Sequence, residues 1–329
     1  MKLISIVTGC FNEEDNVEEL YTRIRTQFER LPAYNYEHIF IDNASTDGTV
    51  RKIKALAAQD RRVKLIVNTR NFGHIRSPIH ALLQARGDAV IAMASDLQEP
   101  PELIAEFVNK WEQGYRIVAG VKPRSQQSPF MSFVRRSFYA TIGRIADTRL
   151  IPNFTGFGLY DRSIIEIIRQ MDDPYPYFRG MIADIGFEHA EVSFVQPRRV
   201  RGISKNNFYT LYDMAILGIT SHSKVPIRLA TMAGFALSAL SLLVAIVYLV
   251  YKLVRWEQFS VGVAPVVIGF FFFASVQLFF IGILGEYIAA IHTQVMKRPL
   301  VVEKERINFD QAAVSPAATS ANPPGTPNQ

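Results

Sequence analysis

Cysteine is almost absent from this sequence. Among its 329 residues there is one, Cys10. A single cysteine excludes an internal disulfide and a metal site built from several thiolates. Because Cys10 lies in an apolar, β-rich run, we expect a buried and unreactive thiol.

Two common nucleotide-binding motifs are also missing. No GxGxxG follows the first β-rich run, Ile4–Thr8, which disfavours a dinucleotide-binding site. No P-loop motif, GxxxxGK followed by Ser or Thr, is present either. Residues 1–7 are too short an apolar segment, and reach a polar turn too soon, to be a signal peptide.

Acidic residues are outnumbered by basic ones, and charge is missing altogether from two long stretches. The chain has 36 Lys and Arg against 30 Asp and Glu, a formal charge of +6 that suits an anionic partner such as nucleic acid or a membrane surface. Leu229–Tyr251 and Phe259–Gly285 carry no charge. Each exceeds the roughly 20 residues with which a helix crosses a bilayer. We therefore expect two transmembrane helices, and a lipid bilayer as partner in place of nucleic acid.

A hairpin of two spans places both ends of the chain on one side of the membrane. Because the charged N-terminal part has no export signal, that side should be the cytoplasm. Basic residues flank the spans there, as the positive-inside rule expects: Lys224, Arg228, Lys297 and Arg298. We expect a multi-pass protein of the cell (inner or plasma) membrane, with catalytic domain and both termini cytoplasmic.

In the N-terminal half, β-rich runs alternate with helical patterns. The runs are Ile4–Thr8, His38–Ile41, Val63–Val67, Ala89–Met93 and Tyr115–Val121. Between them, apolar residues recur at helical spacing. This alternation predicts βαβ units, a mostly parallel sheet and an α/β fold.

Polar side chains follow four of these runs directly. The groups are Asn12 with Glu13, Asp42 with Asp47, Arg70 with Asn71, and Asp96 with Gln98. Any one such turn could reflect only capping and turn chemistry. Four on one edge of one sheet favour a ligand site, because ligands of open α/β sheets bind beyond the carboxyl ends of the strands. Asp96 and Gln98 offer the oxygen ligands that Mg²⁺ or Mn²⁺ shares with substrate phosphates.

Four motifs resemble those of family 2 glycosyltransferases. They are Phe11–Glu14 (family YNEE), 42–49 (DNASTDGT; family DDGSxDxT), Arg70–Gly73, and 96–101 (DLQEPP; family DADLQDPPE). Within that family the chain resembles the polyprenyl-phosphate glycosyltransferases, a group that includes bactoprenol glucosyltransferases and dolichol-phosphate mannose synthases. The resemblance implies a Rossmann-like GT-A fold, a UDP-sugar donor, a polyprenyl (undecaprenyl) phosphate acceptor and a homo-oligomer, tetrameric in some relatives.

The same resemblance implies roles for individual residues. Asp42 would accept a hydrogen bond from the uracil ring, and the nucleotide pocket would be lined by Asn12, Glu13, Asp47 and Arg70. Asp96 and Gln98 would hold the metal on the diphosphate and so take part in catalysis. The implied reaction is an inverting transfer of a hexose, with glucose as the favoured sugar.

Two departures from the family pattern concern missing acids. The family has an acid two residues before the metal-binding Asp, where this chain has Ala94, and its proposed catalytic base falls at Gly156. A hydroxyl acceptor needs such a base. A phosphate monoester does not, because it is largely dianionic at pH 7. Asp161 remains a weaker catalytic candidate; its alternatives are an ion pair with Arg162 or a cap for helix Ser163–Met171.

The segment ahead of the membrane is basic and matches the family's RxxGxSK. It contributes the candidate ligands of the acceptor phosphate: Arg199, Arg201, Ser204 and Lys205. Arg offers a bidentate fork and Lys a point charge to phosphate, although such a patch can also serve only as a positive-inside flank. We expect amphipathic helices at the membrane interface over Phe130–Ile145 and Asn206–Ser221.

We accordingly divide the chain into a catalytic domain (1–196), a basic juxtamembrane region (197–226), two transmembrane helices (227–296) and a cytoplasmic C-terminal segment (297–329), disordered from about residue 312.

Two alternatives to the implied function stay open. One is a hydroxyl-directed or processive polysaccharide synthase, against which the absence of QxxRW and of a base at Gly156 both count. The other, kept open by Ala94, is a sugar-nucleotide sensor without turnover.

Overall fold

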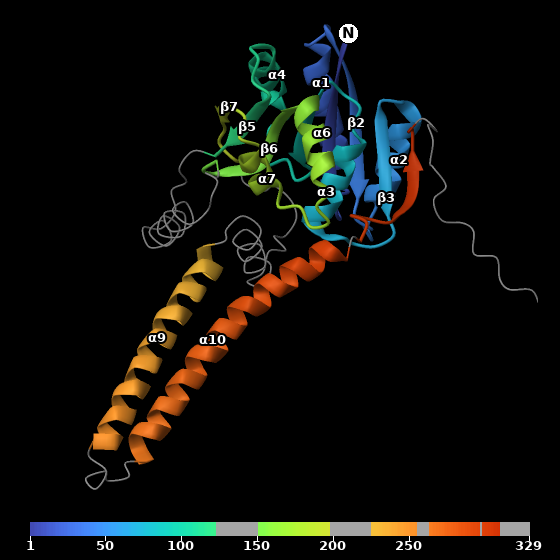
Figure 1. Cartoon of the computed structure of the whole chain (residues 1–329). Coiled ribbons are helices and arrows are strands. Elements are labelled where there is room, and N and C mark those ends of the chain that lie inside the picture. The colour runs from blue at the N-terminus through green and yellow to red at the C-terminus, as the bar shows by residue number, and fades with distance from the viewer. Residues whose placement is uncertain (123–150, 198–224, 255–262, 297, 310–329) are drawn as a thin grey trace, which may run out of the picture.

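The computed structural model describes residues 1–122, 151–197, 225–254, 263–296 and 298–309. These residues form an α/β body and two long helices that extend from it (Figure 1). The segments for which we expected interfacial helices, Phe130–Ile145 and Asn206–Ser221, lie outside the described residues.

The described strands form one mixed, mostly parallel sheet, so the predicted α/β fold is confirmed. The strand order is β7-β5-β6-β4-β1-β2-β3-β8. Strands β4, β1, β2 and β3 run parallel, whereas β6 is antiparallel to both of its neighbours and β8 is antiparallel to β3. The bounds are β1 Lys2–Cys10, β2 Tyr34–Asp42, β3 Val63–Asn68, β4 Ala89–Ala94, β5 Ile117–Val121, β6 Phe154–Asp161, β7 His189–Ser193 and β8 Glu303–Ile307.

Helices cover both faces of this sheet, and the two-residue period of the strands explains why. In β1, Ile4 and Ile6 belong to one buried apolar cluster and Val7 to the other, because successive side chains point to opposite faces. Cys10 is buried, as expected. The helices are α1 Val17–Glu29, α2 Thr49–Gln59, α3 Gly73–Gln84, α4 Ile104–Glu112 after a 3-10 turn (Pro101–Leu103), α6 Arg162–Met171, α7 Phe178–Ile185, α9 Val225–Val254 and α10 Val263–Val295.

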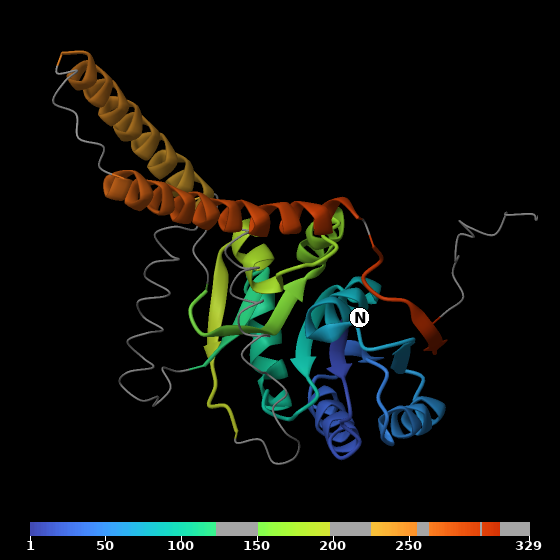
Figure 2. The ribbon, with the colours of Figure 1, turned by 90° about the horizontal axis from the view of Figure 1, so that it is seen from below.

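The two C-terminal helices are long and apolar. In the described part of the chain, one helix is long and apolar enough to cross a membrane, over Phe272–Val295 within α10. The predicted span Phe259–Gly285 overlaps α10, and its residues 259–262 lie outside the described residues. The other predicted span, Leu229–Tyr251, lies inside the continuous helix α9. Large apolar side chains on both helices are exposed, for example Leu243 and Phe279. Figure 2 shows α10 passing beside the α/β body.

The chain beyond α10 returns to the sheet, which the sequence did not predict. β8 pairs with β3 at the edge of the sheet, with Leu65 opposite Ile307. Its sequence, EKERI, is highly charged, and charged residues are typical of an edge strand that must not pair with other chains. Within the expected C-terminal segment, residues 303–307 therefore belong to the sheet.

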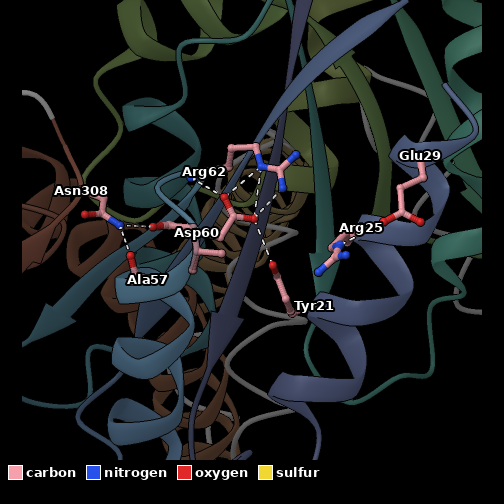
Figure 3. A network of polar contacts seen from close by, with 8 residues as sticks. Tyr21, Arg25, Glu29, Ala57, Asp60, Arg62 and Asn308 are labelled. Atoms are coloured by element: carbon pink, nitrogen blue, oxygen red, sulfur yellow. Dashed lines mark hydrogen bonds and ion pairs between the residues drawn. The ribbon is translucent and has the colours of Figure 1, made fainter. Parts of the chain in front are cut away.

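A residue just past β8 ties the tail to the α2–β3 connection (Figure 3). The side-chain amide of Asn308 donates to the carbonyls of Ala57 and Val63, each at 2.8 Å. Asp60, in the same connection, accepts hydrogen bonds from Arg62 and from the hydroxyl of Tyr21 on α1. These contacts fix the C-terminal segment to an ordered part of the body.

Candidate active site at the carboxyl edge of the sheet

Parallel pairing brings the four polar turns together. Cys10 at the end of β1 lies opposite Asp42, and Gly9 lies opposite Ala94 at the end of β4. Asp42 in turn lies opposite Val67 near the end of β3. The residues that follow β1, β2, β3 and β4 therefore meet at one edge, where ligands of open α/β sheets bind.

Hydrogen bonds join the turn after β1 to the turn after β2. The main-chain N–H of Asn12 donates to Oγ of Ser45 at 2.9 Å, and Oδ1 of Asn12 accepts from the N–H of Thr46 at 2.8 Å. The N–H of Glu13 donates to Oγ1 of Thr49 at 2.8 Å. The two turns thus form one rigid unit.

Asp47 belongs to this unit and holds it together. Its Oδ1 accepts from the main chain of Thr49 at 3.0 Å, in the first turn of α2, and its Oδ2 accepts from the N–H of Glu14 at 3.3 Å. Burial acts to raise the pKa of Asp47, but these hydrogen bonds outweigh it and lower the pKa. Both oxygens are engaged within the protein, so Asp47 stabilises the turn that leads into α2, whose N-cap residue is Gly48.

Asn43 performs the equivalent task between β2 and β3, and the sequence did not single it out. Its Oδ1 accepts from the N–H of Phe72 at 2.9 Å and from Asn68 at 3.2 Å, while its Nδ2 donates to the carbonyl of Gly73 at 2.9 Å. Asn43 therefore shapes the loop that carries Arg70. Its position directly after Asp42, within the motif of residues 42–49, was the available signal.

Asp42 and Arg70 differ in their surroundings. Asp42 is fully buried, and its Oδ2 accepts from the N–H of Ser45 at 2.9 Å. Among the described residues, no group donates to its Oδ1. Burial raises the pKa of Asp42. Arg70 is exposed, and its guanidinium lies 4.0 Å from the centre of the Phe72 ring, a cation–π contact.

Backbone strain gathers at the same edge. Asn12 after β1, Ala44 after β2 and Leu97 after β4 have φ values of 58°, 62° and 57°. The left-handed region costs a residue with a Cβ about 1–2 kcal/mol, though less for Asn. Such strain persists where the surrounding structure over-determines it, typically at ligand sites.

Asp96 and Gln98 flank the strained residue Leu97. Oδ1 of Asp96 accepts from the main-chain N–H of Gln98 at 3.2 Å, and the Gln98 side chain donates to the carbonyl of Pro197 at 3.4 Å. Within the described ranges, no three His, Cys, Asp or Glu side chains are grouped as a metal site. A site made of one carboxylate, one amide oxygen and substrate phosphates does not need three such side chains. Its donors are all oxygen atoms, which fits Mg²⁺ or Mn²⁺.

Glu99, the next residue, was not singled out from the sequence. Its Oε2 accepts from the N–H of Ala94 at 2.7 Å, and its Oε1 accepts from the hydroxyl of Thr155 at 3.1 Å. Burial raises the pKa of Glu99 to about 7, and the charge of Asp96 acts in the same direction. Glu99 joins the end of β4 to the start of β6.

A pocket of about 510 Å³ opens beside Glu99. Residues of strands β1, β4 and β6, of α3 and of the start of α7 line it. Among them are His74, Arg179, Gly156 and Phe178. Its volume is in the range of small-molecule sites. The pKa of His74 is lowered by burial and by the nearby Arg179.

The structure does not bring Asp161 to this edge. In the antiparallel β4–β6 pair, Asp161 lies opposite Ala89, at the start of β4, whereas Asp96 follows the end of that strand. Oδ1 of Asp161 caps α6 by accepting from the N–H of Ser163 at 2.9 Å, and Oδ2 accepts from Trp111 at 2.8 Å. The capping alternative is what the structure contains, so we no longer regard Asp161 as catalytic.

The candidate ligands of the acceptor phosphate, Arg199, Arg201, Ser204 and Lys205, lie outside the described residues.

Comparisons with known proteins identify the family. Residues 5–168 match Glycosyl transferase family 2. An uncharacterized glycosyltransferase of Synechocystis sp. is 33% identical over 298 residues, which cover 90% of this chain and 93% of the relative. The bactoprenol glucosyl transferase of Shigella phage SfII is 33% identical over 305 residues, covering 92% and 97%.

Among solved structures, a mannosyltransferase from Pyrobaculum calidifontis, in complex with GDP-Man and Mn²⁺, superposes with a TM-score of 0.45 at 17% identity, covering 90% of this chain and 87% of that one. Glucosyl-3-phosphoglycerate synthase from Mycobacterium tuberculosis, with Mn²⁺, UDP and phosphoglyceric acid, gives a TM-score of 0.46 at 18% identity, covering 67% and 76%. From the sequence matches over most of its length, the chain belongs to glycosyl transferase family 2.

Proposed function

We propose that this protein is a membrane-anchored, inverting glycosyltransferase that moves a hexose, with glucose as the favoured sugar, from a UDP-sugar to a polyprenyl phosphate. The observation that carries the proposal is the 33% identity with a bactoprenol glucosyl transferase over 92% of this chain. A match of that extent includes the C-terminal helices as well as the α/β body. Two proteins that shared only a nucleotide-binding domain would not need to match over the C-terminal helices.

The donor's nucleotide would bind at the edge where the turns after β1, β2 and β3 meet. Oδ1 of Asp42 is a buried acceptor without a donor among the described residues. A buried acceptor left unpaired costs about 1–3 kcal/mol, and the ring N–H of uracil is a suitable donor. Arg70, at the rim of this edge, would contact the nucleotide from the solvent side.

Asp96 and Gln98 would hold Mg²⁺ or Mn²⁺ on the diphosphate. When bound, the ion would neutralise the negative charge that develops on the leaving UDP. Asp96 is held in position for that ion by its contact with the main chain of Gln98. The acceptor's phosphate oxygen attacks the anomeric carbon as the bond from that carbon to the UDP oxygen breaks. No proton has to be removed, which agrees with a glycine at position 156.

The acceptor would reach the site from the membrane. Helices α9 and α10 would act as a two-span hairpin in the inner or plasma membrane, with the catalytic domain on the cytoplasmic side. An acceptor embedded in the bilayer keeps its phosphate in the layer where the domain docks, which favours productive orientation. That phosphate would be bound by Arg199, Arg201, Ser204 and Lys205. We also expect the protein to form homo-oligomers, as the polyprenyl-phosphate glycosyltransferases that it resembles do.

Labelled UDP-glucose tests the proposal directly. Membranes containing the protein should transfer label to a lipid that mild acid cleaves, and membranes without it should not. Binding of UDP-glucose without lipid labelling would favour the sensor. The double variant Arg199→Ala, Lys205→Ala should weaken use of the lipid phosphate more than UDP-glucose binding; equal loss of both would mean that the pair is structural.

A further inference from the structure

The pocket between α3 and the start of α7 contains a single carboxylate among its described lining residues. That residue is Glu99, and most of the lining is apolar, including Val7, Ile79 and Phe178. Two cationic or basic side chains, His74 and Arg179, line the same pocket. A carboxylate in an apolar pocket binds polar ligand groups strongly, because there is little water to compete.

Glu99 is fixed in place. One oxygen accepts from the main chain of Ala94 and the other from the side chain of Thr155, at 2.7 and 3.1 Å. A carboxylate has about four acceptor sites. These two contacts hold Glu99 in one orientation and leave it able to accept further hydrogen bonds from a ligand in the pocket.

Glu99 also joins two segments that line the pocket. It contacts Ala94, and it contacts Thr155, the neighbour of Gly156. Gly156 itself is a poor position for a second acid, because its φ of +103° would strain any residue with a Cβ. Among the described lining residues, Glu99 is therefore the carboxylate that stands where these two segments meet.

We propose that Glu99 recognises the transferred sugar by accepting hydrogen bonds from hydroxyl groups of the donor's hexose. This inference rests on the proposed function. A hexose is attached directly to the diphosphate that Asp96 would hold, and Glu99 follows Asp96 by three residues in the same turn. The sugar would then enter the pocket between α3 and α7, with Glu99 at its wall.

The test compares the affinity for UDP with the affinity for UDP-glucose. Both are measured at pH 8, where Glu99 with its pKa of about 7 is mostly ionised, by calorimetry with Mn²⁺ on the full chain in detergent micelles. The proteins compared are the wild type, Glu99→Gln and Glu99→Ala. We expect UDP to bind within about twofold of wild type in both variants. UDP-glucose should bind about 10- to 100-fold more weakly to Glu99→Ala, the range for a lost hydrogen bond to a charged group, and by a smaller factor to Glu99→Gln.

Glu102→Gln is the matched control, because Glu102 lies in the next turn and forms an exposed ion pair with Arg23 at 2.7 Å. It should leave both affinities unchanged. Retained UDP binding also shows that each variant is folded. If Glu99→Ala lowers the affinities for UDP and UDP-glucose by the same factor, or leaves both unchanged, the sugar-recognition role is overturned while the proposed function stands. If the wild type binds no UDP-glucose, both are overturned.

Discussion

The imidazole Nε2 of His80 lies 2.6 Å from Oε1 of Glu303, although 223 positions separate the two residues in the chain. Arg306 donates to both oxygens of Glu303 and, at 3.0 Å, to Gln84. The strand that follows the apolar helix α10 is thereby bound to α3, the helix that lines the candidate pocket.

We predict that Glu303→Gln lowers the apparent Tm at pH 7 and that the loss becomes smaller as the pH falls from 5 to 3. Burial acts to raise the pKa of Glu303, but the hydrogen bonds from His80 and Arg306 outweigh it and hold the pKa at about 2, below its ordinary value of 4.5. A depressed pKa adds stability above pH 4.5, and that stability is lost as the pH falls towards 2. The expected loss at pH 7 is about 1–3 kcal/mol.

Thermal unfolding of the full chain between pH 3 and 8 measures this difference. Glu305→Gln is the control on the same strand, because it removes one exposed ion pair, with Lys54 at 2.6 Å, and should cost at most about 0.5 kcal/mol. A Glu303→Gln deficit that stays constant with pH would contradict the assignment.

Asn308 offers a second test of the docked tail. It has a φ of 59° and donates two hydrogen bonds to main-chain carbonyls. Asn308→Gly keeps the backbone conformation without strain and removes both bonds, so it should destabilise the fold by about 1–2 kcal/mol. Asn308→Ala adds the cost of a Cβ at positive φ and should be worse. Thermal unfolding would show this ranking, and equal stability of all three proteins would mean that the tail does not dock in solution.

Asp42→Asn should weaken UDP binding while sparing the fold. The mutation removes a buried charge whose pKa burial has raised, so the apparent Tm at pH 7 should stay the same or rise. The affinity for UDP should fall about 10- to 100-fold, the range for a lost hydrogen bond to a charged group. Asp47→Asn should have the opposite effects. It should lower the Tm, because it disrupts the contacts with Thr49 and Glu14, and it should spare the affinity for UDP. Calorimetry and thermal unfolding on both variants would separate a ligand-binding acid from a structural one.

Asp96→Asn should reduce transfer of glucose to lipid by at least about 100-fold, since it removes the carboxylate proposed to orient the metal and diphosphate. UDP binding should also lose its enhancement by Mn²⁺. Glu106→Gln, a substitution at an exposed position on α4, serves as the comparison and should keep both properties. Full activity of Asp96→Asn would remove the metal assignment.

Asp161→Ala should lower stability without changing the chemistry. It removes the cap of α6, worth about 1 kcal/mol, and leaves Trp111 without its acceptor. The kcat measured below the unfolding temperature should remain within about twofold of wild type. A large loss of kcat in a folded Asp161→Ala variant would restore the catalytic role that the geometry withdraws.

The sequence alone was sufficient for the α/β class, the first five strands and the four polar turns. These features depend on local period and on turn residues: Ile4, Ile6 and Val7 alternate between faces, and Asp42 and Asp96 directly follow apolar strands. The family motifs sit in the same turns. The two apolar C-terminal stretches could be recognised as helices from composition and length.

Other features depended on which segments become neighbours, and only the tertiary structure decided them. The charged strand β8 has no apolar period, and its place in the sheet follows from pairing with β3. The antiparallel direction of β6 puts Asp161 at the far end of the sheet and Thr155 beside Glu99. Asn43 acts between two turns that are distant in sequence. Hydrogen bonds of this kind join segments whose proximity is set by packing of the whole sheet, so no local pattern records them.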